Sequence, residues 1–345
     1  MTGNPFEPGL ALAALFYDEV LKPIVDSTPH AAGLLGPGSD VLGLDSERST
    51  DHDWGPRAQL FVRDGSVDAV RRAVEQSLPE TFRGLPTRFG NDRTQAAHHV
   101  EVVTLDDWLR DHLGFVPSGA VTQREWLTTP QQLLLGVTAG EVFRDDTGAL
   151  GAVRERLSWY PNDLWVWLLA CQWRRIWQEE SFVGRAAECG DDLGARVVAA
   201  RLVRDLMRLC FLLERRYAPY SKWLGSSFAR LDAGTTLAPL LEEAVGAGDN
   251  TRRQAALNAA CSAVGELHNS AGVTEPVDAT PRRFHGRPYM VLGAERFVAA
   301  CLKQVDDASL LALPLTGAVD QFVDSTDVLS HHDLARQAAA LLDAG

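Results

Sequence analysis

Acidic residues gather in one short stretch of the chain, "GPGSDVLGLDSERSTDHDWGP", residues 36–56. Within it, Asp51 and Asp53 stand two positions apart, just before an alternating segment, residues 57–64, that we expect to be a strand. If that strand already begins at Asp51, both carboxylates point to the same face, because strand residues i and i+2 do so. Such a pair resists double ionisation unless a cation lies nearby. Oxygen ligands of this kind suit Mg²⁺ and predict phosphoryl-type chemistry, with an acidic surface loop as the alternative interpretation.

A glycine-serine pair precedes these acidic residues. Gly38 and Ser39 follow a short apolar segment, residues 30–36, that we expect to be a buried strand. Glycine lets a backbone approach a phosphate, and a serine hydroxyl and exposed amides can bond its oxygens. A third carboxylate, Glu101, lies in "HHVEVVTL", residues 98–105, another expected strand. Adjacent strands could bring Glu101 beside the two aspartates.

The elements that must position these residues follow from the periodicity of the chain. Apolar residues at helical spacing predict helices over residues 8–26, 66–78 and 106–114. These helices alternate with the three expected strands, which is typical of a small α/β or α+β domain. After about residue 120 the strand signals vanish and helical periodicity continues. We therefore predict an α+β protein with a small mixed-sheet domain over residues 1–118 and an all-helical domain over residues 119–345.

Composition and charge narrow the classes of function. Hydrophobic residues make up 46% of the chain and the formal net charge is −13. This charge argues against bulk nucleic-acid binding, which usually requires a basic face. No apolar run is long enough to span a membrane, and the first residues lack the basic region of a signal peptide. The five cysteines are widely spaced and form no C-x-x-C pair, so we expect buried thiols in a cytoplasmic protein.

The motifs together resemble a known superfamily. "GSD" at residues 38–40, "STDHDWGP" at residues 49–56 and a carboxylate on a later strand resemble the nucleotidyltransferase superfamily of DNA polymerase beta. With "YAPYSKWLG" at residues 217–225 and "HGRPYMVLG" at residues 285–293, the chain is similar to a bacterial branch catalogued as a domain of unknown function. The resemblance to the aminoglycoside nucleotidyltransferases is more distant.

The resemblance implies a reaction. Asp51 and Asp53 would hold Mg²⁺, with two ions expected, and Gly38 and Ser39 would bind the triphosphate of an NTP, with ATP favoured. Glu101 would complete the metal site or act as general base; many members of the superfamily carry an aspartate at this position. A nucleoside monophosphate would pass to a hydroxyl of a small-molecule or protein acceptor, and pyrophosphate would leave. The helical domain would select the acceptor.

Two basic residues are further candidates for phosphate contacts. Arg88 lies in "LPTRFG" between two expected strands, and Lys222 lies in "YAPYSKWLG" after a long helix. A lysine acts as a point charge toward a triphosphate, while packing at a helix end is the alternative interpretation for this motif. A function of another class also stays open: a nucleotide-binding regulatory or antitoxin-like module that acts on a partner protein.

Overall fold

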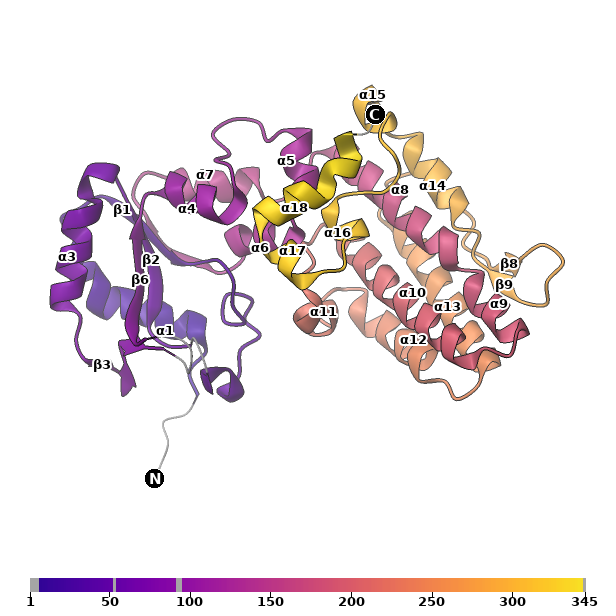
Figure 1. Ribbon diagram of the computed structural model, residues 1–345, viewed down its shortest axis with the longest axis horizontal. Helices are drawn as coiled ribbons and strands as arrows, with labels where there is room; N and C mark the ends of the chain where they lie inside the picture. The colour runs from indigo at the N-terminus through magenta and orange to yellow at the C-terminus, as the bar shows by residue number, and fades with distance from the viewer. Residues whose placement is uncertain (1–5, 52–53, 91–94, 344–345) are drawn as a thin grey trace. The chain divides into compact units, whose positions relative to one another are not determined.

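The chain folds into two compact units (Figure 1). The computed structural model describes residues 6–51, 54–90 and 95–343. Unit 1 comprises Met1–Glu125, Gln132–Ser158 and Ser330–Asp333, and unit 2 comprises Trp126–Gln131, Trp159–Leu329 and Leu334–Gly345. The fold class is α+β, as the sequence predicts, with a small mixed sheet and many helices.

The elements from the first helix to the middle of the chain contain most of the strands. The helices are α1 (Gly9–Phe16), the π-helical turn η1 (Tyr17–Leu21), α2 (Lys22–Val25), the 3₁₀ helices η2 (Glu47–Asp51) and η3 (Asp64–Ser66), α3 (Val67–Ser77), α4 (Leu105–Leu113), α5 (Gln123–Thr128), α6 (Gln131–Thr138) and α7 (Ala149–Arg156). The strands are β1 (His30–Leu34), β2 (Arg57–Val62), β3 (Thr81–Phe82), β4 (Leu85–Pro86), β5 (Arg88–Phe89), β6 (Ala97–Val103) and β7 (Glu141–Asp145).

The later elements are almost all helical. The helices are α8 (Asn162–Glu179), α9 (Phe182–Glu188), α10 (Asp192–Leu213), α11 (Ser221–Phe228), α12 (Gly234–Gly246), α13 (Asn250–Ser270), α14 (Glu295–Leu302), α15 (Ala308–Leu311), α16 (Val319–Phe322), α17 (Thr326–Ser330), α18 (His332–Ala338) and η4 (Ala339–Asp343). Between α13 and α14 a short hairpin joins β8 (Arg282–Arg283) and β9 (Met290–Val291).

Unit 1 is built on a five-stranded mixed sheet with the strand order β5-β6-β2-β1-β7. β1 runs antiparallel to β2 and β7, while β2 and β6 are parallel. A parallel pair needs a crossover connection, and the chain between β2 and β6 supplies α3 for it. Figure 1 shows β1, β2 and β6 side by side, with α1 and α3 beside them. Gln59 at the centre of the sheet lies opposite Gly33 on β1 and Glu101 on β6.

The two faces of this sheet have different surroundings. Alternate residues of β2 and β6 join α1 and α3 in one buried apolar cluster, which includes Leu12, Phe16, Ala58, Leu60, Val62, Val70, Val74, Val100 and Val102. The residues between them, such as Gln59 and Glu101, therefore belong to the opposite face. There the Phe61 ring contacts the Trp108 ring of α4, with 5.5 Å between centroids. Thr104 caps α4 by accepting from the Asp107 amide, and Gly114, with φ +77°, ends the helix.

Strands also occur where the sequence analysis expects only helix. The predicted loss of strands after residue 120 is wrong for β7, which pairs with β1, and for the β8–β9 hairpin. Gly140, with φ +69°, ends the helical segment before β7, because this backbone region favours glycine. The first compact unit therefore extends beyond residue 118 and includes Gln132–Ser158.

Unit 2 has a helical core rich in tryptophan. Trp165, Trp167 and Trp173 of α8 are buried. The expectation of buried thiols is met at Cys171, Cys210, Cys261 and Cys301 and is wrong for Cys189, which is exposed. Among the described residues, no helix has the length and apolar character needed to cross a membrane.

Candidate functional site

Three of the predicted site residues, Gly38, Ser39 and Asp51, lie in segments near one end of the unit 1 sheet, and Glu101 lies further along β6. Because β1 is antiparallel to β2 and β2 is parallel to β6, the end of β1 lies beside the starts of β2 and β6. Gly38 and Ser39 follow β1 at this end, and η2, which ends at Asp51, leads toward β2. Glu101 lies in β6 on the strand neighbouring β2. The topology thus gathers the glycine-serine turn and the approach to β2, with Glu101 on the strand beside β2.

An ion pair fixes the glycine-serine turn to the start of β2. The Arg57 guanidinium donates from Nε to Asp40 Oδ2 at 2.9 Å and from Nη2 to Asp40 Oδ1 at 2.6 Å. Nη2 also donates to the carbonyl of Pro37 at 3.3 Å. Asp40 is buried, and its side chain accepts from the Val41 amide as well. A bidentate arginine-carboxylate pair is among the stronger and more directional contacts in proteins, so this turn has a defined position.

Gly38 is the tightest point of the turn. A Cβ atom there would lie 2.3 Å from Asp40 Oδ1 and 2.5 Å from Arg57 Nη2, and its φ is +147°. The absence of a side chain therefore lets the guanidinium approach the backbone closely. Within the described part of the chain, Ser39 makes one hydrogen bond, in which its carbonyl accepts from the Leu44 amide at 2.7 Å. Toward the described residues, its hydroxyl and amide make no hydrogen bond.

Gln59 links the turn to Glu101. Its side-chain oxygen accepts from the Leu35 amide at 2.9 Å, and its backbone lies opposite Glu101 in the pairing of β2 and β6. Glu101 is an exposed residue, yet the surrounding protein raises its pKa, chiefly by desolvation. The negative charge of Asp111 acts in the same direction, while hydrogen bonds from Gln59 and the Trp108 indole oppose the shift. A bound cation would lower this pKa, so the carboxyl fits either role predicted for it.

Asp51 has a different placement from the predicted one. The expectation that a strand begins at Asp51 is wrong, because Asp51 ends the 3₁₀ helix η2 and β2 begins only at Arg57. Pro56, which lacks an amide hydrogen for a strand ladder, stands directly before β2. Asp53 lies outside the described residues. Over the residues that the structure describes, no group of three histidines, cysteines or acids is placed to hold a metal ion. The three-carboxylate site therefore stays a prediction.

The two predicted basic contacts lie away from the turn in sequence and have other partners. Arg88 on β5 forms an ion pair with Glu75 at 2.9 Å. Lys222 belongs to unit 2, where its Nζ lies 4.8 Å from the centre of the Trp223 ring. For both residues, phosphate binding stays a prediction.

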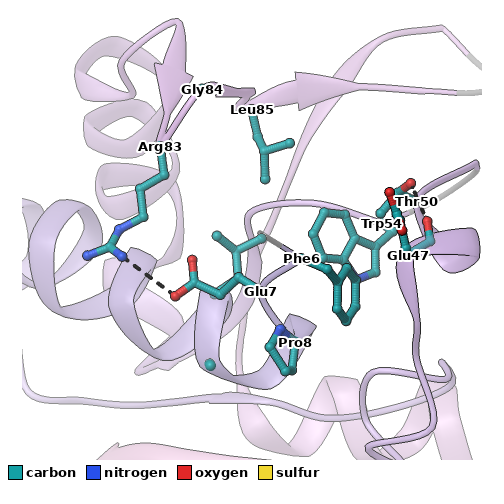
Figure 2. A pocket seen from close by; sticks show the side chains of 11 residues that line it. Phe6, Glu7, Pro8, Glu47, Thr50, Trp54, Arg83, Gly84 and Leu85 are labelled. Atoms are coloured by element: carbon teal, nitrogen blue, oxygen red, sulfur yellow. Dashed lines mark hydrogen bonds and ion pairs between the residues drawn. The ribbon is translucent and has the colours of Figure 1, made fainter. Parts of the chain in front are cut away.

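A cavity of about 940 Å³ opens next to this region (Figure 2). Its wall includes Thr50 and Trp54, which flank the Asp51–Asp53 segment in sequence. The Phe6 and Trp54 rings stack at 5.7 Å with 29° between their planes. The Trp54 indole N–H donates to Asp45 Oδ2 at 3.1 Å, and the same oxygen accepts from the Gly9 amide at 2.7 Å.

Sequence analysis missed the residues that organise this end of the sheet. Asp40 and Asp45 belong to the acidic stretch and serve as anchors for Arg57 and Trp54. The sequence indicates part of this arrangement. A buried acid needs a partner, and the acidic stretch is followed directly by Arg57, at which β2 begins. Sequence alone does not reveal which acid pairs with that arginine.

Comparisons with known proteins give two matches. The family model "Domain of unknown function (DUF4037)" matches residues 126–224, from within α5 to within α11. The crystal structure of a nucleotidyltransferase-like protein from Exiguobacterium sibiricum 255-15 is similar over 86% of this chain and 89% of that chain, with 13% sequence identity and a TM-score of 0.33. No curated protein matches the chain.

Proposed function

We propose that this protein is a magnesium-dependent nucleotidyltransferase. The acceptor hydroxyl attacks the α-phosphorus of an NTP, with ATP favoured, and a new P–O bond forms. The bond between the α-phosphorus and the bridging oxygen to the β-phosphate breaks, so pyrophosphate leaves with its electron pair. The hydroxyl proton passes to a base. The products are the acceptor carrying a nucleoside monophosphate and pyrophosphate, and the acceptor is a small molecule or a protein.

The glycine-serine turn and the three carboxylates each have a role in this reaction, and Arg88 and Lys222 stay predicted phosphate contacts. Gly38 and Ser39 offer a backbone amide and a hydroxyl to the triphosphate, while Arg57 adds a positive charge beside the turn. Asp51, Asp53 and Glu101 would hold Mg²⁺, which when bound would neutralise phosphate charge and polarise the α-phosphate. Glu101 is the alternative proton acceptor, and burial raises its pKa, which makes the carboxylate a stronger base than an ordinary glutamate.

One observation carries the proposal. The parallel pairing of β2 and β6 sets Glu101 opposite Gln59, and Gln59 binds the Leu35 amide at the start of the turn that contains Gly38 and Ser39. The turn that we propose to bind phosphate and a carboxylate on the neighbouring strand are thus connected through one residue, Gln59.

Label transfer tests this proposal. The purified protein is incubated with Mg²⁺, each α-³²P-labelled NTP in turn and a cell extract, and labelled products are separated. We expect transfer from at least one NTP, and we expect Asp53→Asn to abolish it, because removal of one metal-ligand charge weakens Mg²⁺ binding. Asp64→Asn is the matched control, since Asp64 is an exposed acid on η3.

Calorimetry provides the outcome that would reject the proposal. If no NTP binds the wild-type protein in the presence of Mg²⁺, the enzyme has no substrate and the nucleotidyltransferase function is wrong. Equal transfer by the wild-type protein and Asp53→Asn would remove the aspartate pair from the mechanism.

A further inference from the structure

The cavity behind the glycine-serine turn has the size and lining of a ligand site. Its volume of about 940 Å³ is within the range of small-molecule pockets. We propose that it receives the base of the bound nucleotide and prefers a base with an exocyclic amino group. This inference rests on the proposed function, since it assigns one part of the NTP to residues that the sequence analysis did not single out.

An aromatic wall supplies the surface for a planar ring. Figure 2 shows Phe6 beside Trp54, with Leu85 across the cavity. Asp45 holds the Trp54 indole through its N–H, so this ring has a fixed orientation. Phe6 stacks on it and stays partly exposed. Bases of every kind stack on such rings, because each has a π face.

The charges of the cavity favour an amino-bearing base over a phosphate. Two carboxylates, those of Glu7 and Glu47, and one guanidinium, that of Arg83, line it. Arg83 is already bound by Glu19 at 2.6 Å and Glu7 at 3.6 Å. Glu47 forms no ion pair with any described residue. A carboxylate accepts hydrogen bonds from an exocyclic amine and repels phosphate oxygens.

The first residue of α1 contacts both the glycine-serine turn and the aromatic wall of the cavity. At Gly9 a Cβ atom would lie 2.6 Å from Asp40 Cβ and 3.1 Å from Trp54 Nε1, so α1 begins between the turn and the cavity wall. Asp40 belongs to the turn and Trp54 to the aromatic wall. A nucleotide with its triphosphate at Gly38 and Ser39 therefore has an adjacent cavity of suitable chemistry for its base.

Titration calorimetry separates the base from the phosphates. Mg·ATP, Mg·UTP and Mg·tripolyphosphate are titrated into the full chain and into Phe6→Leu. We expect Phe6→Leu to weaken ATP binding about tenfold, because the aromatic stack is lost, and to leave tripolyphosphate binding unchanged. Phe6→Tyr keeps the ring and should bind ATP like the wild type. Phe182→Leu is the matched control, since Phe182 is an exposed phenylalanine of unit 2.

Base preference is the second readout. The wild type should bind ATP more tightly than UTP, which lacks an exocyclic amine, and Glu47→Gln should reduce this difference. Unchanged ATP affinity in Phe6→Leu, an equal loss for tripolyphosphate, or equal binding of ATP and UTP by the wild type would each overturn the inference while leaving the proposed function intact. A wild type that binds none of the three ligands would reject the proposed function and, with it, the inference.

Discussion

At the scale of single residues, Gly38 carries the sharpest prediction. In Gly38→Ala the new methyl group would meet both Asp40 Oδ1 and Arg57 Nη2. The two side chains must then shift, which we expect to weaken the ion pair and the fixed position of the turn. We expect Mg·ATP to bind about tenfold more weakly, which corresponds to the loss of one charge-assisted hydrogen bond. Calorimetry measures this change.

Gly119→Ala is the control for Gly38→Ala. A Cβ atom at Gly119 meets no atom within 4 Å, so this substitution should not change ATP binding. If Gly38→Ala binds ATP like the wild type, the Asp40–Arg57 pair does not organise the phosphate site.

Single residues also show how far the sequence could predict the site. The residue types of Gly38, Ser39 and Glu101 indicated their proposed chemistry; Gly38 and Ser39 follow β1, and Glu101 lies in β6 opposite Gln59. Asp40 and Arg57 could not be paired in advance, because their contact depends on how the turn folds back onto β2. The strand geometry assumed for Asp51 was wrong, since the chain makes a 3₁₀ turn before Pro56.

At the scale of elements, Gly140 controls the pairing of β7. Its φ is +69°, and a Cβ atom would lie 2.0 Å from the Leu34 carbonyl oxygen of β1. Because this neighbour is backbone, Gly140→Ala must displace β1 or β7. We expect a loss of about 2 to 4 kcal/mol in the free energy of unfolding of unit 1. Urea denaturation followed by circular dichroism measures it.

Gly148→Ala is the control that measures the backbone strain alone, so the difference between the two variants gives the steric part of the loss. Gly148 has nearly the same φ, +70°, but open space around its Cβ position. It should therefore cost only the backbone strain, about 1 kcal/mol. Equal destabilisation by the two substitutions would show that the approach to Leu34 has no role.

The elements near the site were largely predictable, whereas β7 was not. The segment at 57–64 alternates and the segment at 98–105 is also rich in β-branched residues, and they form β2 and β6. Thr104 and Gly114 mark the two ends of α4 as capping rules require. β7 follows the apolar helix α6 after two residues, so the helical spacing of apolar residues in the sequence runs on into the strand. In the structure Gly140, with its positive φ, stands between the two elements.

At the scale of the whole molecule, buried carboxyl groups make the stability of unit 2 depend on pH. Glu180 accepts hydrogen bonds from the amides of Gly293 and Ala294, at 3.0 and 3.1 Å, yet desolvation raises its pKa to about 7. The pKa of Asp320 is raised to about 6, again by desolvation. Desolvation lowers the pKa of His268 to about 4. As pH rises, the two acids lower the stability of unit 2 and the histidine raises it.

The sign of the Glu180 effect follows from proton linkage. Between its unfolded pKa near 4.5 and its folded pKa near 7, the folded state retains a proton that the unfolded state has lost. Stability from this group is therefore present at low pH and is lost as pH rises through this window. Asp320 acts likewise between about 3.8 and 6, whereas His268 adds stability as pH rises from about 4 to 6.5. Above pH 6.5, Glu180 makes the largest contribution of the three to the change of stability with pH.

Glu180→Gln isolates this contribution, because the amide oxygen still accepts a hydrogen bond and carries no charge. We expect the wild type to lose on the order of 3 kcal/mol relative to Glu180→Gln between pH 4.5 and pH 7. Tryptophan fluorescence during urea denaturation reports mainly on unit 2, since of nine tryptophans only Trp54 and Trp108 lie in unit 1. A constant difference between the two proteins across this range would mean that Glu180 is already ionised at pH 4.5 and that its two backbone hydrogen bonds outweigh its desolvation.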